Sequence, residues 1–126
     1  MKIRIEELTR RVEEHKTRSA WDRGVKDYAI DLLGDLEYNT EDGEIDTDEL
    51  QEAMLNGAKD WKAYSWGGCS LIYDCDIAKS LCTPSELKKT RGGERRPNSR
   101  EEWLDVQARA LYQAAWLIMR TAKAIG

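Results

Sequence analysis

The chain has 126 residues and a formal net charge of −4, with 40 % hydrophobic and 35 % charged residues. This length favours one domain over residues 1–126, and the acidic balance excludes a uniformly basic protein of the kind that binds duplex nucleic acid. No run of 18 apolar residues and no secretory-type amino terminus occurs, so we expect a cytoplasmic protein with no membrane partner.

Helical spacing of apolar residues dominates the first half of the chain. A thin stripe on a charged segment predicts a first helix over about 3–16, and a stronger stripe over 21–36 predicts a second helix with Ser19 as its cap. A third helix is predicted to start at Asp46 or Thr47. These elements indicate an all-α, compact helical bundle.

The second half contains more chain-breaking residues. The spacing of apolar residues over 71–81 favours a further helix, and Thr83-Pro84 followed by Glu86 predicts the start of a short one. Residues 88–101, KKTRGGERRPNSRE, are expected to form a basic loop ahead of a final helix that runs from Ser99 to about residue 124.

The predicted last helix is nearly all apolar between Ala108 and Met119, where Arg109 and Gln113 are the strongly polar exceptions. A helix of this profile must be covered on every side. In so small a domain, a subunit interface is the simplest cover, so we expect a homo-oligomer.

Residues suited to catalysis or metal binding are scarce. His15 is the only histidine and lies among charged residues, so no Ser-His or Cys-His pair is predicted and we expect no enzyme. Cys69, Cys75 and Cys82 match no zinc pattern and are expected to be buried, reduced thiols. An EF-hand reading of the acidic loop fails because Tyr38 would occupy its first ligand position, so neither a metal nor a cofactor is predicted.

Charge is separated along the chain. Nine carboxylates and no Lys or Arg occur between Asp35 and Glu52, whereas six cations and only Glu94 occur between residues 88 and 100. Upstream of the basic stretch, aromatic residues surround the pair Gly67-Gly68. Cations bind phosphate, rings stack on bases, and a helix N-terminus attracts anions.

The candidate ligand is therefore a small nucleotide. We expect two rings to stack on its bases, an amide to contact base or ribose, and the cations to contact phosphate. These candidate ligand-binding residues are Trp66, Tyr73, Lys89, Arg91, Arg95, Arg96, Asn98, Arg100 and Arg109.

Residues 65–115, SWGGCSLIYDCDIAKSLCTPSELKKTRGGERRPNSREEWLDVQARALYQAA, resemble small helical proteins carried by phages and mobile elements of gut bacteria. The similarity extends over about residues 17–118, and within this group the chain is most similar to the Thoeris anti-defence sponge family. The resemblance implies a homo-oligomer that binds cyclic ADP-ribose-type immune signals, or cyclic oligonucleotides, without degrading them. It assigns no binding residue, so the candidate site rests on side-chain chemistry.

Two other functions stay open at this point. The chain is alternatively a protein-binding inhibitor of a host defence complex, in the manner of an anti-CRISPR, acting through the acidic face 35–52 or through the basic loop. A third reading is a hydrolase or transferase that acts on the same nucleotide.

Overall fold

The computed structural model describes residues 1–64, 81–89, 91–92 and 95–125, with the backbone alone described at 59–64, 84, 95–97 and 100. Four α-helices lie in this part of the chain. The helix predicted over 71–81 lies outside it except for Leu81, and so do Cys69 and Cys75, which were predicted to be buried thiols. The described elements, in chain order, are β1 (Lys2–Arg4), α1 (Ile5–Glu13), α2 (Ala20–Tyr38), β2 (Glu44–Asp46), α3 (Thr47–Tyr64), the 3-10 turn η1 (Pro84–Glu86), β3 (Leu87–Lys89), β4 (Arg95–Pro97) and α6 (Arg100–Ile125).

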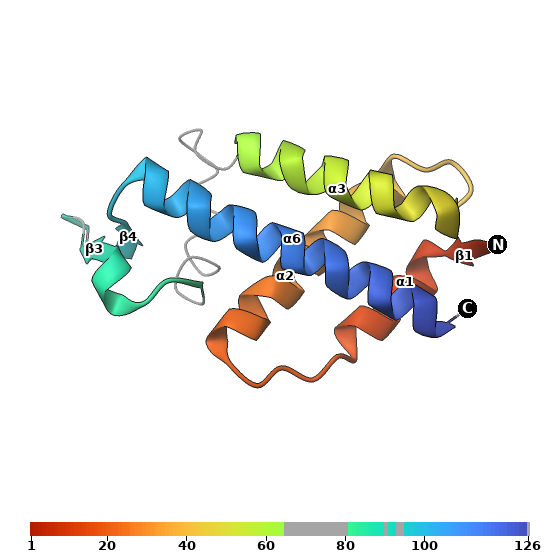
Figure 1. Cartoon of the computed structure of the whole chain (residues 1–126), viewed down its shortest axis with the longest axis horizontal. Coiled ribbons are helices and arrows are strands. Elements are labelled where there is room, and N and C mark those ends of the chain that lie inside the picture. Colours follow the sequence, from red (N-terminus) through yellow and green to blue (C-terminus); the bar gives the residue numbers. More distant parts are fainter. Residues whose placement is uncertain (65–80, 90, 93–94, 126) are drawn as a thin grey trace.

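The long helix α6 organises the bundle. It runs along the length of the molecule and packs against α1, α2 and α3 (Figure 1). Its inner face contributes Trp103, Leu111 and Ile118, all with at most 1 % of their surface exposed. The expected all-α bundle is thus confirmed at the level of its helices.

The core is largely apolar in the described region, and a polar pair lies inside it. Gln107, fully buried, donates a hydrogen bond from Nε2 to the hydroxyl of Tyr28 at 3.1 Å. The aromatic residue therefore uses its polar tip as expected for a buried tyrosine. The largest fully buried side chains are Trp103, Tyr28, Ile5, Leu8, Leu33, Leu50, Met54, Leu111, Ile118, Gln107 and Val12.

Helix starts follow the predicted caps. The Ser19 side chain accepts a hydrogen bond from the Asp22 N–H at 3.1 Å, and Ser99 accepts one from the Glu102 N–H at 3.2 Å. At α3, the Asp46 carboxylate accepts from the Asp48 N–H at 3.0 Å. These three boundaries are confirmed because each depends on a side chain next to the helix it starts.

The first predicted helix is shorter than expected. Its first residues form β1, which pairs antiparallel with β2 in the register Lys2↔Asp46, Ile3↔Ile45 and Arg4↔Glu44. Gly43, at φ 71°, turns the chain so that its carbonyl accepts the Ile5 N–H at 2.9 Å. The alternation of charged and apolar residues in KIRI is the strand pattern, and the partner strand lies forty residues away.

The prediction that α6 is apolar on nearly all sides is wrong. Tyr112 and Trp116 have 49 % and 57 % of their surface exposed, and Asp105, Arg109 and Arg120 lie on the same exposed side. Aromatic rings with polar tips tolerate water, so a run of apolar letters overstated how much of this helix is covered. None of the helices in the described part of the chain is long and apolar enough to span a membrane.

Candidate anion-binding hairpin

The basic stretch forms a two-stranded ribbon and not the expected loop. β3 and β4 pair antiparallel in the register Leu87↔Pro97, Lys88↔Arg96 and Lys89↔Arg95. Two of the three cross-strand positions therefore place a cation opposite a cation. Like charges directly opposite one another destabilise an antiparallel pair, so this register is electrostatically unfavourable and a nearby anion would stabilise it.

A set of short contacts fixes the base of this hairpin. Glu86 accepts hydrogen bonds from the Thr83 N–H and hydroxyl, both at 2.9 Å, which forms the glutamate half of the predicted capping box. The Glu86 N–H donates to the Thr83 carbonyl at 2.9 Å. The turn stops after one 3-10 turn, and the chain continues into β3. From the returning strand, Asn98 donates its backbone N–H to the Glu86 carbonyl at 3.0 Å and its side-chain amide to the Ser85 carbonyl at 2.7 Å.

The hairpin is joined directly to the start of α6. Only Asn98 and Ser99 separate β4 from the first residue of the helix, Arg100. The free N–H groups and positive dipole end of α6 add to the positive charge at this place, which is unfavourable for cations and favourable for an anion.

Three cations of the hairpin have side chains that the structure describes. Lys88, Lys89 and Arg91 are exposed, and none of them forms an ion pair with another described residue. Successive strand residues point to opposite faces, so Lys88 and Lys89 present charge on both sides of the ribbon.

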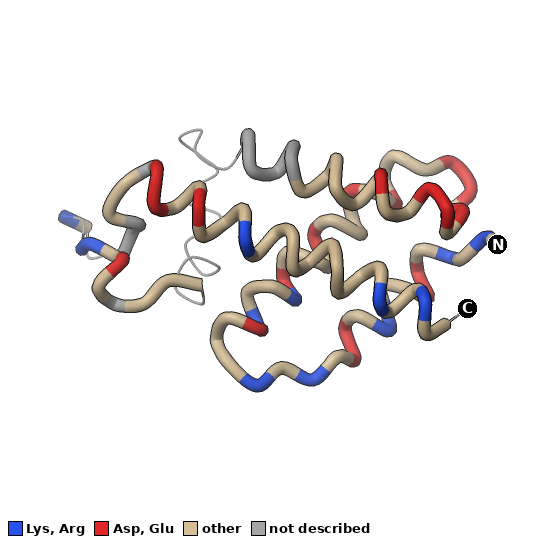
Figure 2. The backbone as a smooth tube through the Cα atoms, viewed as in Figure 1, with Lys and Arg blue, Asp and Glu red and all other residues tan. Residues whose placement is uncertain are grey.

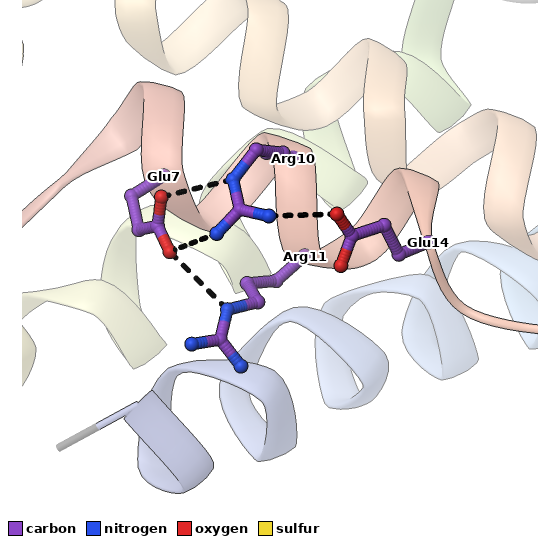
Figure 3. Close-up of polar contacts among 4 residues, drawn as sticks. All are labelled: Glu7, Arg10, Arg11 and Glu14. Carbon is purple, nitrogen blue, oxygen red and sulfur yellow. Dashed lines mark hydrogen bonds and ion pairs between the residues drawn. The ribbon is translucent and has the colours of Figure 1, made fainter.

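The cations of α1 show the opposite arrangement (Figure 3). Arg10 lies between Glu7 and Glu14, with its Nη1 2.6 Å from a Glu14 oxygen, and Arg11 Nε lies 3.2 Å from Glu7. Hydrogen bonds from Arg10 and then Arg11 lower the pKa of Glu7, and Glu7 in turn raises the pKa of Arg10. The chain therefore neutralises its arginines with neighbouring carboxylates on α1, but it supplies no such partners to the described cations of the hairpin.

The structure brings several predicted site residues together and separates others. Lys89, Arg91, Arg95 and Arg96 belong to one hairpin, and Arg100 follows it. Trp66 and Tyr73, the predicted stacking rings, lie outside the described residues.

Asn98 and Arg109 have structural contacts of their own. Asn98 donates a side-chain amide hydrogen bond to the Ser85 carbonyl. This structural role at the base of the hairpin was not predicted from the sequence. Arg109 lies 3.7 Å from Asp105 and 5.7 Å from the ring centre of Trp21, away from the hairpin along α6. The pKa of Glu86 is lowered chiefly by its hydrogen bonds from Thr83, with a smaller contribution from the charge of Arg109.

Lys88 was missing from the candidate set. The register places it directly opposite Arg96. The signal that would have found it is the symmetric spacing of two cation pairs about the Gly92-Gly93 turn, KK…GG…RR, which is the pattern of a hairpin.

Cys82, next to this site, is a partly buried free thiol. Burial, followed by the charges of Glu86 and Glu102, raises its pKa to about 11. At neutral pH the thiol is therefore protonated and a poor nucleophile.

The acidic segment forms a second charged surface at the opposite end of the molecule (Figure 2). It covers the end of α2, the loop to β2 and the start of α3. Asp46 lies 3.7 Å from the amino-terminal ammonium of Met1, and Tyr38 in the same segment has 89 % of its surface exposed.

Comparisons with known proteins add no identity to this geometry: no family model, no curated protein and no solved structure matches the chain. The resemblance to anti-defence sponges stays a prediction.

Proposed function

We propose that the protein binds a small anionic nucleotide signal and holds it without degrading it, as a phage-encoded anti-defence homo-oligomer in the host cytoplasm. The observation that supports this function most directly is the register of the hairpin, which sets Lys88 opposite Arg96 and Lys89 opposite Arg95. A bound phosphate group between such cations converts a repulsive pair into two charge-assisted contacts.

The placement of the hairpin supports a ligand with more than one phosphate. Exposed cations lie on both faces of the ribbon, and the N-terminus of α6 lies at its base. A cyclic dinucleotide or a cyclic ADP-ribose carries two phosphates, so it is able to contact the ribbon and the helix start together.

The proposal is of binding without turnover. His15, the one histidine in the chain, lines hollows with Leu117 and Arg120 near the far end of α6. Cys82 lies closer to the hairpin, but its raised pKa keeps the thiol protonated. Tight binding of the unreacted ligand does not help a catalyst, but it is all that a sequestering protein needs.

Calorimetry with a matched pair of variants tests this function. The ligands are cyclic ADP-ribose isomers and cyclic di- and trinucleotides, titrated into the full chain and into Lys88→Ala/Lys89→Ala. The control is Lys2→Ala/Arg4→Ala, which removes two cations from the other ribbon. We expect binding by the native chain, a loss of about tenfold or more in affinity for the hairpin variant, and little change for the control.

Two results would contradict the proposal. One is the absence of heat with every nucleotide. The other is an equal loss of affinity in the hairpin variant and in the control, which indicates an effect of net charge alone. Recovery of the ligand after denaturation separates capture from catalysis, because a hydrolase or transferase returns it altered.

A second candidate function uses the acidic end. The last turn of α2 carries Asp35 and Glu37 and no basic residue, although carboxylates at a helix C-terminus are unfavourable by about 0.3–1 kcal/mol each. With the exposed Tyr38 beside them, these charges match a basic surface on another protein, as an inhibitor of a host defence complex requires.

The acidic function has its own test. The variant Asp35→Asn/Glu37→Gln/Glu41→Gln removes three charges but leaves Asp42 and Asp46, whose carboxylates accept backbone hydrogen bonds. An inhibitor that uses this face loses its host partner in a pull-down from infected cells, while a nucleotide sponge keeps its calorimetric affinity.

A further inference from the structure

The exposed side of α6 carries the chain's most prominent aromatic surface in the described region. Tyr112 and Trp116, one turn apart, are 49 % and 57 % exposed, whereas Leu111 and Ala115 beside them are buried. Both lie close to the midpoint of α6, which extends from Arg100 to Ile125. Large exposed rings at the centre of a long helix are typical of a contact surface.

Neighbouring side chains give this surface a fixed edge. Trp21 of α2 donates from Nε1 to the Gln113 side-chain oxygen at 2.7 Å, and the guanidinium of Arg109 lies over the Trp21 ring. Next to this edge, a hollow of about 200 Å³ is lined by Asp22, Gln113, Trp116 and other residues. The surface therefore has both a protruding ring and a recess beside it.

The charges on this side of α6 are divided between its halves (Figure 2). Glu101, Glu102, Asp105 and Arg109 are exposed in the N-terminal half, and Arg120 and Lys123 are exposed in the C-terminal half. Three carboxylates outnumber Arg109, which lies 3.7 Å from Asp105, so the N-terminal half stays acidic and the C-terminal half is basic. An antiparallel copy of the same helix therefore faces acidic residues with basic ones, whereas a parallel copy faces like with like. The surface is complementary to itself.

We infer that this face of α6 binds a second copy of the chain in an antiparallel, two-fold symmetric dimer. A two-fold axis midway between Tyr112 and Trp116 brings Tyr112 of one copy to Trp116 of the other, and Asp105 to Lys123. Aromatic contact at the centre is flanked by two equivalent ion pairs about 13 Å away on either side, at a rise of about 1.5 Å per residue.

The dimer is a specific form of the homo-oligomer in the proposed function. The inference rests on the proposed function only for the expectation that the chain self-associates. Self-association is measured without nucleotide, and nucleotide binding is measured separately by calorimetry on the same variants. A monomeric chain that still binds nucleotide overturns the dimer alone, and a dimer that binds no nucleotide overturns the sponge alone.

Analytical ultracentrifugation of the full chain from about 1 to 100 µM is the primary measurement. We expect a reversible dimer for the native chain and a dissociation constant at least about 100-fold weaker for Tyr112→Ser/Trp116→Ser. The matched control is Tyr38→Ser, which removes a more exposed ring from another helix and leaves the dimer unchanged. A native chain that is monomeric at 100 µM overturns the inference, and so does an aromatic variant that dimerises like the native chain.

A charge swap tests the antiparallel arrangement without touching the rings. Asp105→Lys and Lys123→Glu each place like charges together across the dimer and weaken it by about tenfold, whereas the double variant restores it to within about threefold of the native value. These two positions are about 27 Å apart on one helix, so their compensation can only be between copies. A double variant as weak as the sum of its parts overturns the arrangement.

Discussion

Two antiparallel ribbons of three residues a strand lie at opposite ends of the molecule, and they differ in how they treat charge (Figure 2). In the β1–β2 ribbon, Lys2 faces Asp46 and Arg4 faces Glu44, with Ile3 and Ile45 between them. In the β3–β4 ribbon, lysines face arginines. The first ribbon pairs opposite charges across its strands, whereas the second pairs like charges.

The surroundings of the two ribbons reinforce this difference. The first is held by hydrogen bonds from the Thr47 N–H and hydroxyl to the Met1 carbonyl and by the buried side chain of Ile3, which is 5 % exposed. The second is held at its base by Glu86 and Asn98, while the cations described along it are exposed. The first ribbon is therefore tied to the core, whereas the second exposes its described cations to solvent.

The largest expected difference between the ribbons is in packing. Ile3→Ala removes a buried side chain and lowers the free energy of unfolding by about 2–4 kcal/mol. Leu87→Ala, at a half-buried position of β3, lowers it by less than about 1 kcal/mol. Urea denaturation at one protein concentration measures both values. Equal losses would mean that the second ribbon is part of the core and not an appended binding element.

Charge inversion sharpens the comparison at smaller energies. Lys88→Glu places a carboxylate opposite Arg96, so we expect the ligand-free protein to gain up to about 0.5 kcal/mol of stability at low salt. Lys2→Glu places one opposite Asp46 and loses a similar amount. At the same time Lys88→Glu weakens nucleotide binding by at least about tenfold.

A gain in stability combined with a loss of affinity distinguishes a binding site from an ordinary solvated hairpin. If Lys88→Glu lowers the stability of the ligand-free protein, the ribbon is not under electrostatic repulsion. The supporting observation for the sponge is then lost.

Sequence patterns predicted the elements whose signals are local. Ser19 and Ser99 lie next to the helices that they cap, and the stripe from Trp21 to Leu36 is a property of one segment. Thr83 and Glu86 likewise form the glutamate half of the predicted capping box, because the two residues are three positions apart.

The features that were not predicted depend on residues that are distant in the sequence or on partners that are not part of the chain. β1 forms because Glu44–Asp46 pairs with it, and three residues of alternation are too few to outweigh a helical stripe. The candidate site was assembled from residue types alone. Asn98 and Arg109 were therefore included without knowledge of Ser85 and Trp21, their actual neighbours. Local composition indicates which charges gather and does not indicate which of them are already in use.

The smallest predicted effect on the two ribbons is their loss of stability at low pH. A backbone hydrogen bond from Asp48, followed by the charge of the amino terminus, lowers the pKa of Asp46, and hydrogen bonds from Thr83 lower the pKa of Glu86. For a carboxyl whose folded pKa lies below its unfolded one, the stabilisation is present above the unfolded pKa and is lost as the pH falls through the folded pKa. Each ribbon is therefore expected to lose the stabilising charge of one carboxylate in acid. The effect is small because both carboxylates are exposed.

The variants Asp46→Asn and Glu86→Gln isolate this charge effect, because the amide oxygen still accepts the same backbone hydrogen bond. Carboxyl titration by NMR is expected to give both native groups a pKa below the ordinary value. Amide exchange is expected to show that acid no longer loosens the β1–β2 ribbon in Asp46→Asn or the β3–β4 ribbon in Glu86→Gln. In the second ribbon, neutralising Glu86 also removes a negative charge from the residue directly before β3, where cations lie opposite cations in the register, so the exchange of this ribbon should rise more at neutral pH than that of the first. A rise in amide exchange confined to the β1–β2 ribbon would mean that this ribbon, and not β3–β4, depends more on its carboxylate.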